Sequence, residues 1–177
     1  MTIQAKAAPG AHLLNAADHT LIMIDFQSQM AFATKSIDAV NLRTNAALVA
    51  NAAKTFNVST ILTTVAEKSF SGPMFEEIAE AFPGKAMLDR TSMNSWEDAA
   101  VIAEVNRIGK PRIVLAGLWT GVCIVGPALS AIDQGFEVYV IEDATRAIDL
   151  NGSLDAAWKN MKAKGVKRIQ SSDIEVA

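Results

Sequence analysis

Short apolar segments alternate with longer amphipathic segments along the chain, and the two kinds differ in hydrophobic period. The short segments are rich in β-branched residues and bounded by turn formers, which predicts strands. These predicted strands cover residues 20–24, 59–65, 86–88, 112–116, 137–141 and 166–169. The continuous apolar run at 112–116 is typical of a strand that is covered on both faces.

The amphipathic segments carry the start and stop signals of helices. Val40, Ala47, Leu48 and Ala52 recur at helical spacing and predict a helix over residues 38–56. Further helices are predicted from Pro73 to Pro83-Gly84, over 96–108 between an N-cap at Ser95 and a C-cap at Gly109, over 127–134, and over 154–163.

Strands that alternate with helices of this length indicate right-handed βαβ units and a parallel sheet. We therefore predict an α/β fold, a three-layer α/β/α sandwich with a doubly wound, mostly parallel sheet of about six strands, similar to a Rossmann fold. No linker or repeat divides residues 1–177, so we expect a single domain. In such folds the reactive groups lie in loops at the carboxyl ends of the strands.

Composition and charge exclude several classes of function. Half of the 177 residues are apolar, and the scattered basic residues leave a net charge of -3, which disfavours nucleic-acid binding. Residues 1–12 do not resemble a signal peptide, and the longest apolar runs are too short to cross a membrane. The lone cysteine forms no internal disulfide and suits a reducing compartment, so we expect a cytoplasmic protein.

Two chemically capable side chains lie at predicted strand ends. Asp25 directly follows the first strand, and Cys123 lies in the turn between the strand ending at Ala116 and the next helix. A thiol in that turn faces the positive end of a helix dipole, which favours the thiolate and makes it a usable nucleophile. The alternatives are an aspartate that caps a turn and a cysteine that serves as a small buried hydrophobe.

The residues around Cys123 resemble the signature of the isochorismatase-like cysteine hydrolases. Residues 113–131 contain the apolar strand, Ala-Gly, two variable residues, Thr, two more, Cys and a small-residue helix. Asp25 and Gln27 match the aspartate and glutamine after the first strand, and residues 134–144 match the following strand with its Asp-Ala turn. The resemblance extends over residues 17–167. Within the superfamily, the YcaC-like branch is most similar, through Thr63-Thr64, Gly72-Pro73, Phe82-Pro83, Arg90 and Asn94-Ser95-Trp96.

This resemblance implies a catalytic triad and a reaction. Cys123 is the expected nucleophile, and Asp25 is the group that takes its proton and returns it to the leaving group. The thiolate attacks an amide-type carbonyl and forms an acyl-enzyme. Arg90 stands where the superfamily normally has a lysine; an arginine supplies fixed charge but cannot relay a proton. The alternative for Arg90 is a surface ion pair with Asp89 or Glu97.

The resemblance also implies how the oxyanion and the substrate are held. The backbone N–H groups of Trp119 and Cys123 form the oxyanion hole, after a cis peptide bond between Leu118 and Trp119. A small, partly apolar substrate is expected. From loop position, the side chains that we expect to line its pocket are Phe26, Gln27, Met30, Phe70, Asn94, Trp96 and Trp119.

No metal or other cofactor is expected. The nicotinamidase branch binds a metal through an Asp and two His after the second strand, but residues 64–70 contain no histidine. His12 and His19 are expected at the surface. The resemblance implies a homo-oligomer, from a dimer to an octamer, and a chain that is short after Ile169 relative to longer members.

Two other functions stay open from the sequence. One is an isochorismatase-type hydrolase that acts on a non-amide substrate such as a vinyl ether. The other is a non-catalytic binding or redox-sensing domain that uses a reactive cysteine.

Overall fold

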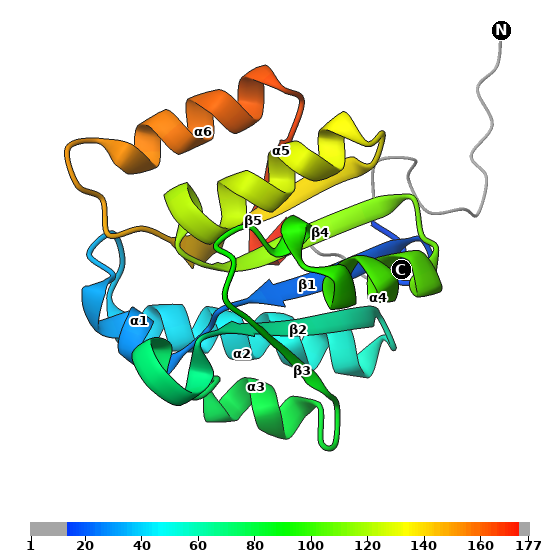
Figure 1. Cartoon of the computed structure of the whole chain (residues 1–177), viewed down its shortest axis with the longest axis horizontal. Helices are drawn as coiled ribbons and strands as arrows, with labels where there is room; N and C mark the ends of the chain where they lie inside the picture. The colour runs from blue at the N-terminus through cyan, green and yellow to red at the C-terminus, as the bar shows by residue number, and fades with distance from the viewer. Residues whose placement is uncertain (1–13, 174–177) are drawn as a thin grey trace, which may run out of the picture.

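Six parallel strands form one sheet, in the order β3-β2-β1-β4-β5-β6, in the computed structural model (Figure 1). The structure describes residues 14–173. The strands are β1 (His19–Ile24), β2 (Ser59–Val65), β3 (Met87–Arg90), β4 (Arg112–Leu118), β5 (Glu137–Arg146) and β6 (Lys167–Ile169). Every neighbouring pair is parallel, as predicted.

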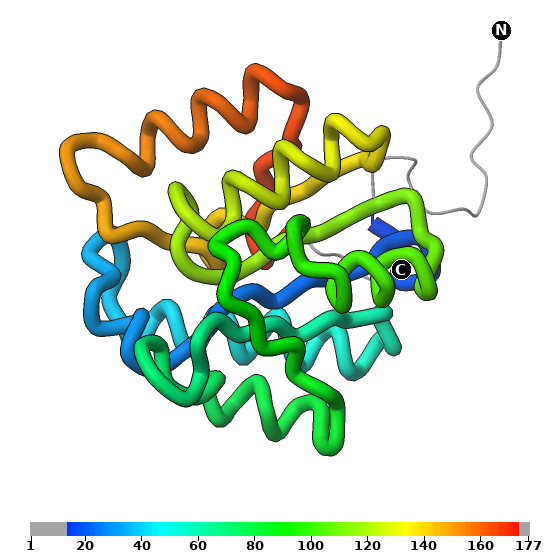
Figure 2. The backbone as a smooth tube through the Cα atoms, viewed as in Figure 1, coloured from blue at the N-terminus to red at the C-terminus, as the bar shows by residue number. Residues whose placement is uncertain are grey.

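Helices cover both faces of the sheet, and the path between them can be followed in Figure 2. The helices are α1 (Ser28–Ala33), α2 (Ala39–Thr55), α3 (Glu76–Ala81), α4 (Ala99–Ile108), α5 (Val125–Asp133) and α6 (Ser153–Ala163), with short helical turns η1 (Glu67–Ser71), η2 (Ser95–Glu97), η3 (Thr120–Ile124) and η4 (Ser171–Asp173). Alternate residues of β1 supply two separate cores. Leu21 and Met23 pack with α1, α2 and α3, whereas Ile22 and Ile24 pack with α4, α5 and α6. The predicted three-layer sandwich is therefore confirmed.

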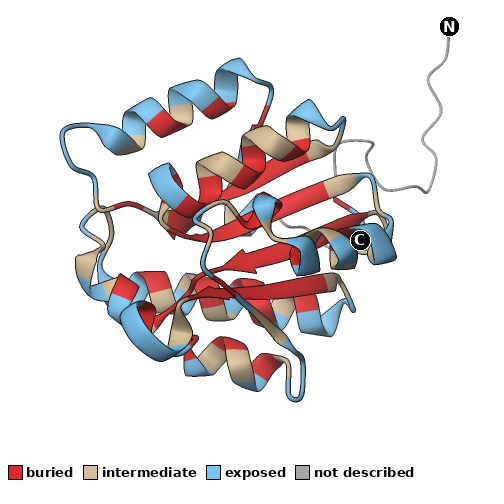
Figure 3. Cartoon of the chain, viewed as in Figure 1, coloured by how far each residue is buried: buried red, intermediate tan, exposed pale blue. Residues whose placement is uncertain are grey.

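The four central strands β1, β2, β4 and β5 are buried along most of their length, whereas the edge strands β3 and β6 are largely exposed or half-buried, and each helix exposes its outer face (Figure 3). For α2 the buried side consists of Leu42, Ala46, Val49, Ala50 and Ala53. Val40 and Leu48, which helped to predict the helix, are 70% and 54% exposed. The helix was predicted correctly, but those two positions belong to its outer face.

Two helix starts differ from the prediction. Pro73 does not open a helix: α3 begins at Glu76, because Met74 is extended and forms a β-bridge with Gln27. The helix predicted from Trp96 is divided into the turn η2 and the helix α4. Asp98 causes the division, since it is extended and its carboxylate caps the N–H groups of Ala100 and Val101.

His19 is buried, so the expectation of a surface histidine is wrong for this residue. It is 4% exposed, and its Nδ1 lies 2.7 Å from the carbonyl oxygen of Asn15. Burial lowers the pKa of His19 below its ordinary value, because the charged form loses its water. His12 lies outside the described residues.

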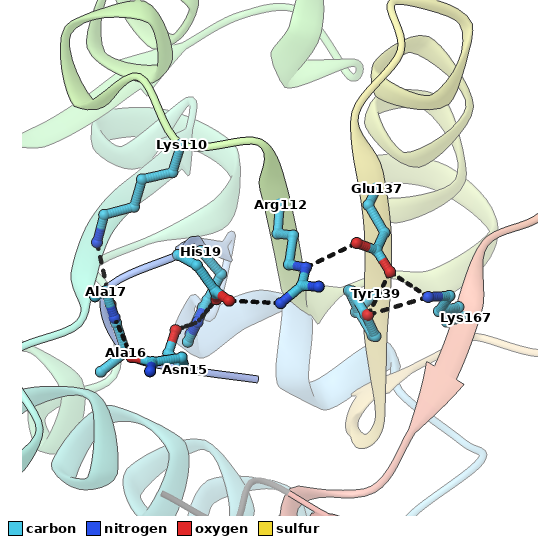
Figure 4. Close-up of polar contacts among 10 residues, drawn as sticks. Asn15, Ala16, Ala17, His19, Lys110, Arg112, Glu137, Tyr139 and Lys167 are labelled. Carbon is cyan, nitrogen blue, oxygen red and sulfur yellow. Dashed lines mark hydrogen bonds and ion pairs between the residues drawn. The ribbon is translucent and has the colours of Figure 1, made fainter. Parts of the chain in front are cut away.

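A chain of polar contacts crosses the amino ends of the strands (Figure 4). Arg112 donates to Asp18 at 2.5 Å and to Glu137 at 2.7 Å. Glu137 also pairs with Lys167 and accepts a 2.6 Å hydrogen bond from the Tyr139 hydroxyl. These donors, Lys167 above all, lower the pKa of Glu137 to about 2. The network joins β4, β5 and β6 near their amino ends. The candidate site lies at the opposite, carboxyl ends of the strands.

Candidate active site

The carboxyl ends of three strands bring Asp25, Arg90 and Cys123 together. Asp25 directly follows β1, Arg90 is the last residue of β3, and Cys123 lies in η3 between β4 and α5. The three residues are 0%, 3% and 1% exposed. A carboxylate, a guanidinium and a thiol are thus enclosed at one edge of the sheet, where doubly wound folds place reactive groups.

The backbone at Asp25 turns sharply, and its polar groups are held by β2 and β3. Its φ of 54° lies in the left-handed region, and its N–H donates to the Thr63 carbonyl at 3.0 Å. Its Oδ2 accepts a 2.7 Å hydrogen bond from Nη2 of Arg90, and its Oδ1 accepts a 3.4 Å contact from the Thr63 hydroxyl. Asp25 is therefore fixed by its neighbours and does not merely cap a turn.

Arg90 reaches across the end of β2, since β2 lies between β3 and β1 in the sheet. Besides its bond to Asp25, its Nη1 donates to the Ser92 carbonyl at 3.0 Å. Asp89 accepts instead from the Thr64 hydroxyl and the Glu67 N–H. Arg90 therefore forms its ion pair with the buried Asp25 and not, as the alternative reading of the sequence had it, with Asp89 or Glu97 at the surface.

Burial shifts the proton affinity of both acidic groups upward. The pKa of Asp25 rises from 3.8 to about 6, because burial outweighs the opposing effects of Arg90, Cys123 and Thr63. Burial, followed by the Asp25 charge, raises the pKa of the Cys123 thiol to about 12, although Arg90 acts in the opposite direction. The resting cysteine is thus a protonated thiol, and the thiolate expected from the helix dipole is not its resting form.

The turn that carries Cys123 is packed tightly against the sheet. The Leu118–Trp119 peptide bond is cis, and the N–H groups of Val122 and Cys123 both donate to the Trp119 carbonyl, at 2.9 and 3.0 Å. Just before the turn, Gly117 has a φ of 142°, and a Cβ there would lie 1.9 Å from the Ile24 carbonyl oxygen. Only glycine therefore permits this approach of β4 to β1.

Two buried threonines join the cysteine turn to β5. The Thr145 hydroxyl donates to the Gly117 carbonyl at 2.7 Å and lies 3.1 Å from the Thr120 hydroxyl. Because the Thr145 proton is used on Gly117, Thr120 must be the donor of the second bond. The two bonds hold the first residue of η3 in place, three residues before Cys123.

Several residues predicted to line the pocket belong to the core instead. Phe26 is fully buried against Phe75, with ring centroids 5.7 Å apart, and Met30 is also buried. The Gln27 side chain forms hydrogen bonds with backbone groups. Its Nε2 donates to the Val65 and Gly72 carbonyls, and its Oε1 accepts from the Val65 N–H. These three residues support the loop after β1 and present no surface to a ligand.

Trp96 is also a packing residue, because its indole lies against Phe136 and its Nε1 donates to Gln134, at the end of α5 remote from Cys123. Trp119 is half-buried, and its Nε1 donates to the Met30 carbonyl and the Thr34 hydroxyl. Phe70, by contrast, is 68% exposed on η1.

Exposed apolar residues that the sequence did not single out lie shortly after other strands, at their carboxyl ends. They are Phe32 on α1, Met93, Val122 in η3 and Leu150. Together with Phe70 they place a large exposed apolar side chain after each of β1 to β5. Apolar residues in turns carried no periodic signal, so their exposure was not predictable from the pattern.

The described residues offer no place for a metal ion and no membrane span. Within residues 14–173, no group of three or more His, Cys, Asp or Glu side chains could hold a metal. In the same part of the chain, no helix combines the length and apolarity that crossing a bilayer requires.

Comparisons with known proteins agree with this architecture. The family model of the isochorismatase domain matches residues 19–173. The probable hydrolase YcaC of Escherichia coli is 30% identical over 151 residues, which cover 85% of this chain and 72% of that protein. The nicotinamidase of Acinetobacter baylyi is 44% identical over 68 residues, which cover 38% of this chain and 32% of that enzyme.

Solved structures extend the match to the whole fold. YcaC from Pseudomonas aeruginosa, described with hexane-2,5-diol and covalent acrylamide, has a TM-score of 0.88 and 29% identity, covering 94% of this chain and 83% of that one. The Escherichia coli YcaC structure, described as an octameric hydrolase of unknown specificity, also gives a TM-score of 0.88, with 29% identity, covering 94% of this chain and 82% of that one. The chain therefore belongs to the isochorismatase family, as a hydrolase of its YcaC-like branch.

Proposed function

We propose that this protein hydrolyses a C–N bond of amide type in a small molecule, with Cys123 as the nucleophile. The observation that carries the proposal is the enclosed contact of Asp25 with both Arg90 and the Cys123 thiol. Among the carboxylates of residues 14–173, Asp25 is the one that acts on the Cys123 thiol, by its charge and by a hydrogen bond. Its raised pKa, about 6, makes it a base that is ionised at neutral pH and can also give the proton back.

The first half of the reaction transfers the acyl group to sulfur. Asp25 takes the proton of the Cys123 thiol while the sulfur forms a bond to the amide carbon, and the carbonyl oxygen becomes an oxyanion. The oxyanion then collapses, the C–N bond breaks, and Asp25 protonates the departing nitrogen. A thioester with Cys123 and a free amine or ammonia result.

The second half returns the enzyme to its starting state. Asp25 takes a proton from water as the water oxygen attacks the thioester carbon. Collapse of this second oxyanion breaks the C–S bond and releases a carboxylic acid, and the thiolate recovers its proton from Asp25. No proton passes through Arg90, which holds its charge throughout.

Backbone N–H groups of Trp119 and Cys123 are the proposed oxyanion donors. The Cys123 N–H already donates to the Trp119 carbonyl at 3.0 Å, so in this proposal it is shared between that carbonyl and the oxyanion. Loss of one such donor typically costs on the order of 10²–10³ in rate.

Relatives support the amide chemistry and the assembly. One relative is a nicotinamidase, an enzyme of amide hydrolysis. A YcaC structure is described with covalent acrylamide, an electrophile that adds to a nucleophile through its vinyl carbon, which supports a reactive nucleophile and not amide cleavage itself. Another YcaC is described as octameric, so we propose that this chain also forms a homo-oligomer. A cytoplasmic location is proposed because the buried thiol suits a reducing compartment.

Two measurements test the proposal. Ammonia release from a panel of primary amides should be abolished in Cys123→Ala and Cys123→Ser. Labelling of Cys123 by acrylamide, followed by intact mass, should rise with pH and level off above about pH 6 as Asp25 ionises.

The alternatives give different results. A thiol with a pKa of about 12 and no assisting base would label about tenfold faster with each pH unit through the neutral range, and this outcome would refute the role of Asp25. Assisted labelling without any amide turnover would instead indicate a redox-sensing domain or a non-amide substrate.

A further inference from the structure

We propose that Asn94 is a positioning residue that clasps the segment bearing Arg90 to the helix that follows the nucleophile. This inference rests on the proposed function and changes the role of Asn94, which the sequence had suggested as a wall of the substrate pocket. The clasp consists of the Asn94 side chain, its hydrogen-bond partner Ser130 on α5, and the close approach of Gly126 to Asn94.

The polar atoms of the Asn94 side chain are already in use within the protein. Its Oδ1 accepts the Trp96 N–H at 3.0 Å and so caps η2. Its Nδ2 donates to the Ser130 hydroxyl and to Oε1 of Glu97, both at 3.2 Å. A substrate would have to break these bonds to use the amide.

On one side, Asn94 is connected to the triad cation. Nη1 of Arg90 donates to the Ser92 carbonyl at 3.0 Å, and the Ser92 hydroxyl donates to the Asn94 carbonyl at 3.1 Å. Two consecutive hydrogen bonds therefore join the guanidinium to Asn94 within five residues of chain. The orientation of Arg90 depends on the backbone of this short segment.

On the other side, Asn94 contacts the helix of the nucleophile. Ser130 lies on α5, which begins two residues after Cys123. Gly126, in the first turn of α5, allows the close approach, since a Cβ there would lie 3.1 Å from Cγ of Asn94. The clasp thus fixes the distance between the element that carries the cation and the element that carries the thiol.

Loosening the clasp should change chemistry as well as stability. Arg90 lowers the pKa of both Asp25 and Cys123 in the folded protein. A less firmly held guanidinium favours the protonated forms, so the pH at which Cys123 becomes reactive should rise. A residue with a purely structural role would not move this midpoint.

The experiment measures acrylamide labelling of Cys123 against pH in the full-length chain. Asn94→Ala, Ser130→Ala and Gly126→Ala should each shift the midpoint to higher pH and lower the rate at pH 6 by about threefold to tenfold, the worth of one hydrogen bond. Asn160→Ala is the matched control, because Asn160 is exposed on α6 and its side chain bonds to no other described residue.

Ser130→Ala and Gly126→Ala keep the proposal testable if Asn94→Ala folds poorly, since both retain the cap on η2. The double variant Asn94→Ala with Ser130→Ala should shift the midpoint no further than the larger single change, because both remove the same bond. Unchanged midpoints in folded variants, even with lowered melting temperatures, would overturn the clasp. If the midpoints shift but the protein hydrolyses no amide, the proposed amide hydrolysis is refuted and the clasp is still supported.

Discussion

Replacing Arg90 by methionine removes the positive charge from the enclosed site but keeps most of the side-chain volume. Asp25 then loses the partner that lowers its pKa, while the burial that raises this pKa persists. We expect the carboxyl group to take up a proton at neutral pH rather than stay charged without a counter-ion.

The cost can be worked from the pKa of Asp25. In the wild-type protein this pKa is raised from 3.8 to about 6, so the stability that Asp25 contributes is full below pH 3.8 and is lost as the pH rises to about 6. At about 1.36 kcal/mol per pKa unit, this loss is about 3 kcal/mol. In Arg90→Met the loss continues to pH 7 and grows by about one further pKa unit, or about 1 kcal/mol. Relative to its stability at acid pH, the variant should therefore lose about 1 kcal/mol more than the wild type by pH 7, or roughly 2–4 °C in melting temperature.

Thermal unfolding from pH 5 to 8 checks this reasoning. The melting temperature of the variant should fall below that of the wild type only above about pH 6. Below that pH the variant should be at least as stable as the wild type, since methionine avoids burying a charge. Amide turnover at pH 7 should fall at least about tenfold, with its acid limb moved upward, because the ionised fraction of Asp25 drops. Arg107→Met, which removes an exposed partner of Glu104, is the control. A destabilisation of equal size at every pH would refute the linkage to Asp25.

Three further substitutions probe the frame of the site. Gly117→Ala should prevent folding or lower the melting temperature by more than about 10 °C, because its Cβ would clash with the Ile24 carbonyl, and circular dichroism would show it. Thr145→Val should cost about 1–3 kcal/mol in urea unfolding by leaving the Gly117 carbonyl without its donor. His19→Gln should flatten the loss of stability on acidification below pH 6.5: the lowered pKa of His19 means that its contribution is full above 6.5 and is lost as the pH falls through the folded value.

Each of these expectations has a contrary result. Gly165→Ala, a positive-φ glycine with open space around it, should be far milder than Gly117→Ala, and equal effects would show that strain and not the clash decides. Unaltered stability in Thr145→Val, or an unchanged acid limb in His19→Gln, would remove the stated roles of those hydrogen bonds and of that buried ring.

The central strands were predictable because strands buried on both faces appear as apolar, β-branched runs. The edge strands β3 and β6 carry little such signal and were located by their place in the alternation of strands and helices. The helix α2 was predictable from apolar spacing but its buried face was not, because apolar residues lie on both sides: Leu42 and Val49 are buried, whereas Val40 and Leu48 are exposed. Pro73 was assigned to a helix from its general preference, whereas its local role was set by a bridge between distant residues.

For the site, strand-end position and motif together pointed to Asp25 and Cys123, but the pairing of Arg90 with Asp25 depends on a contact between residues 65 positions apart. Pocket walls were harder to predict, because the left-handed turn at Asp25 directs the side chain of Phe26 into the core. No local signal in the sequence links Asn94 to Ser130, since their contact exists only once α5 is packed.

The bond between Arg90 and Asp25 also has a consequence for how the chain matures. It joins the edge strand β3 to β1, which lies two strands away. Neither charge can be buried alone without a cost of several kcal/mol, so we expect both to lose their water together when β3 docks. Until β3 docks, the site lacks its guanidinium, so we expect the proposed reactivity of Cys123 to depend on completion of the sheet.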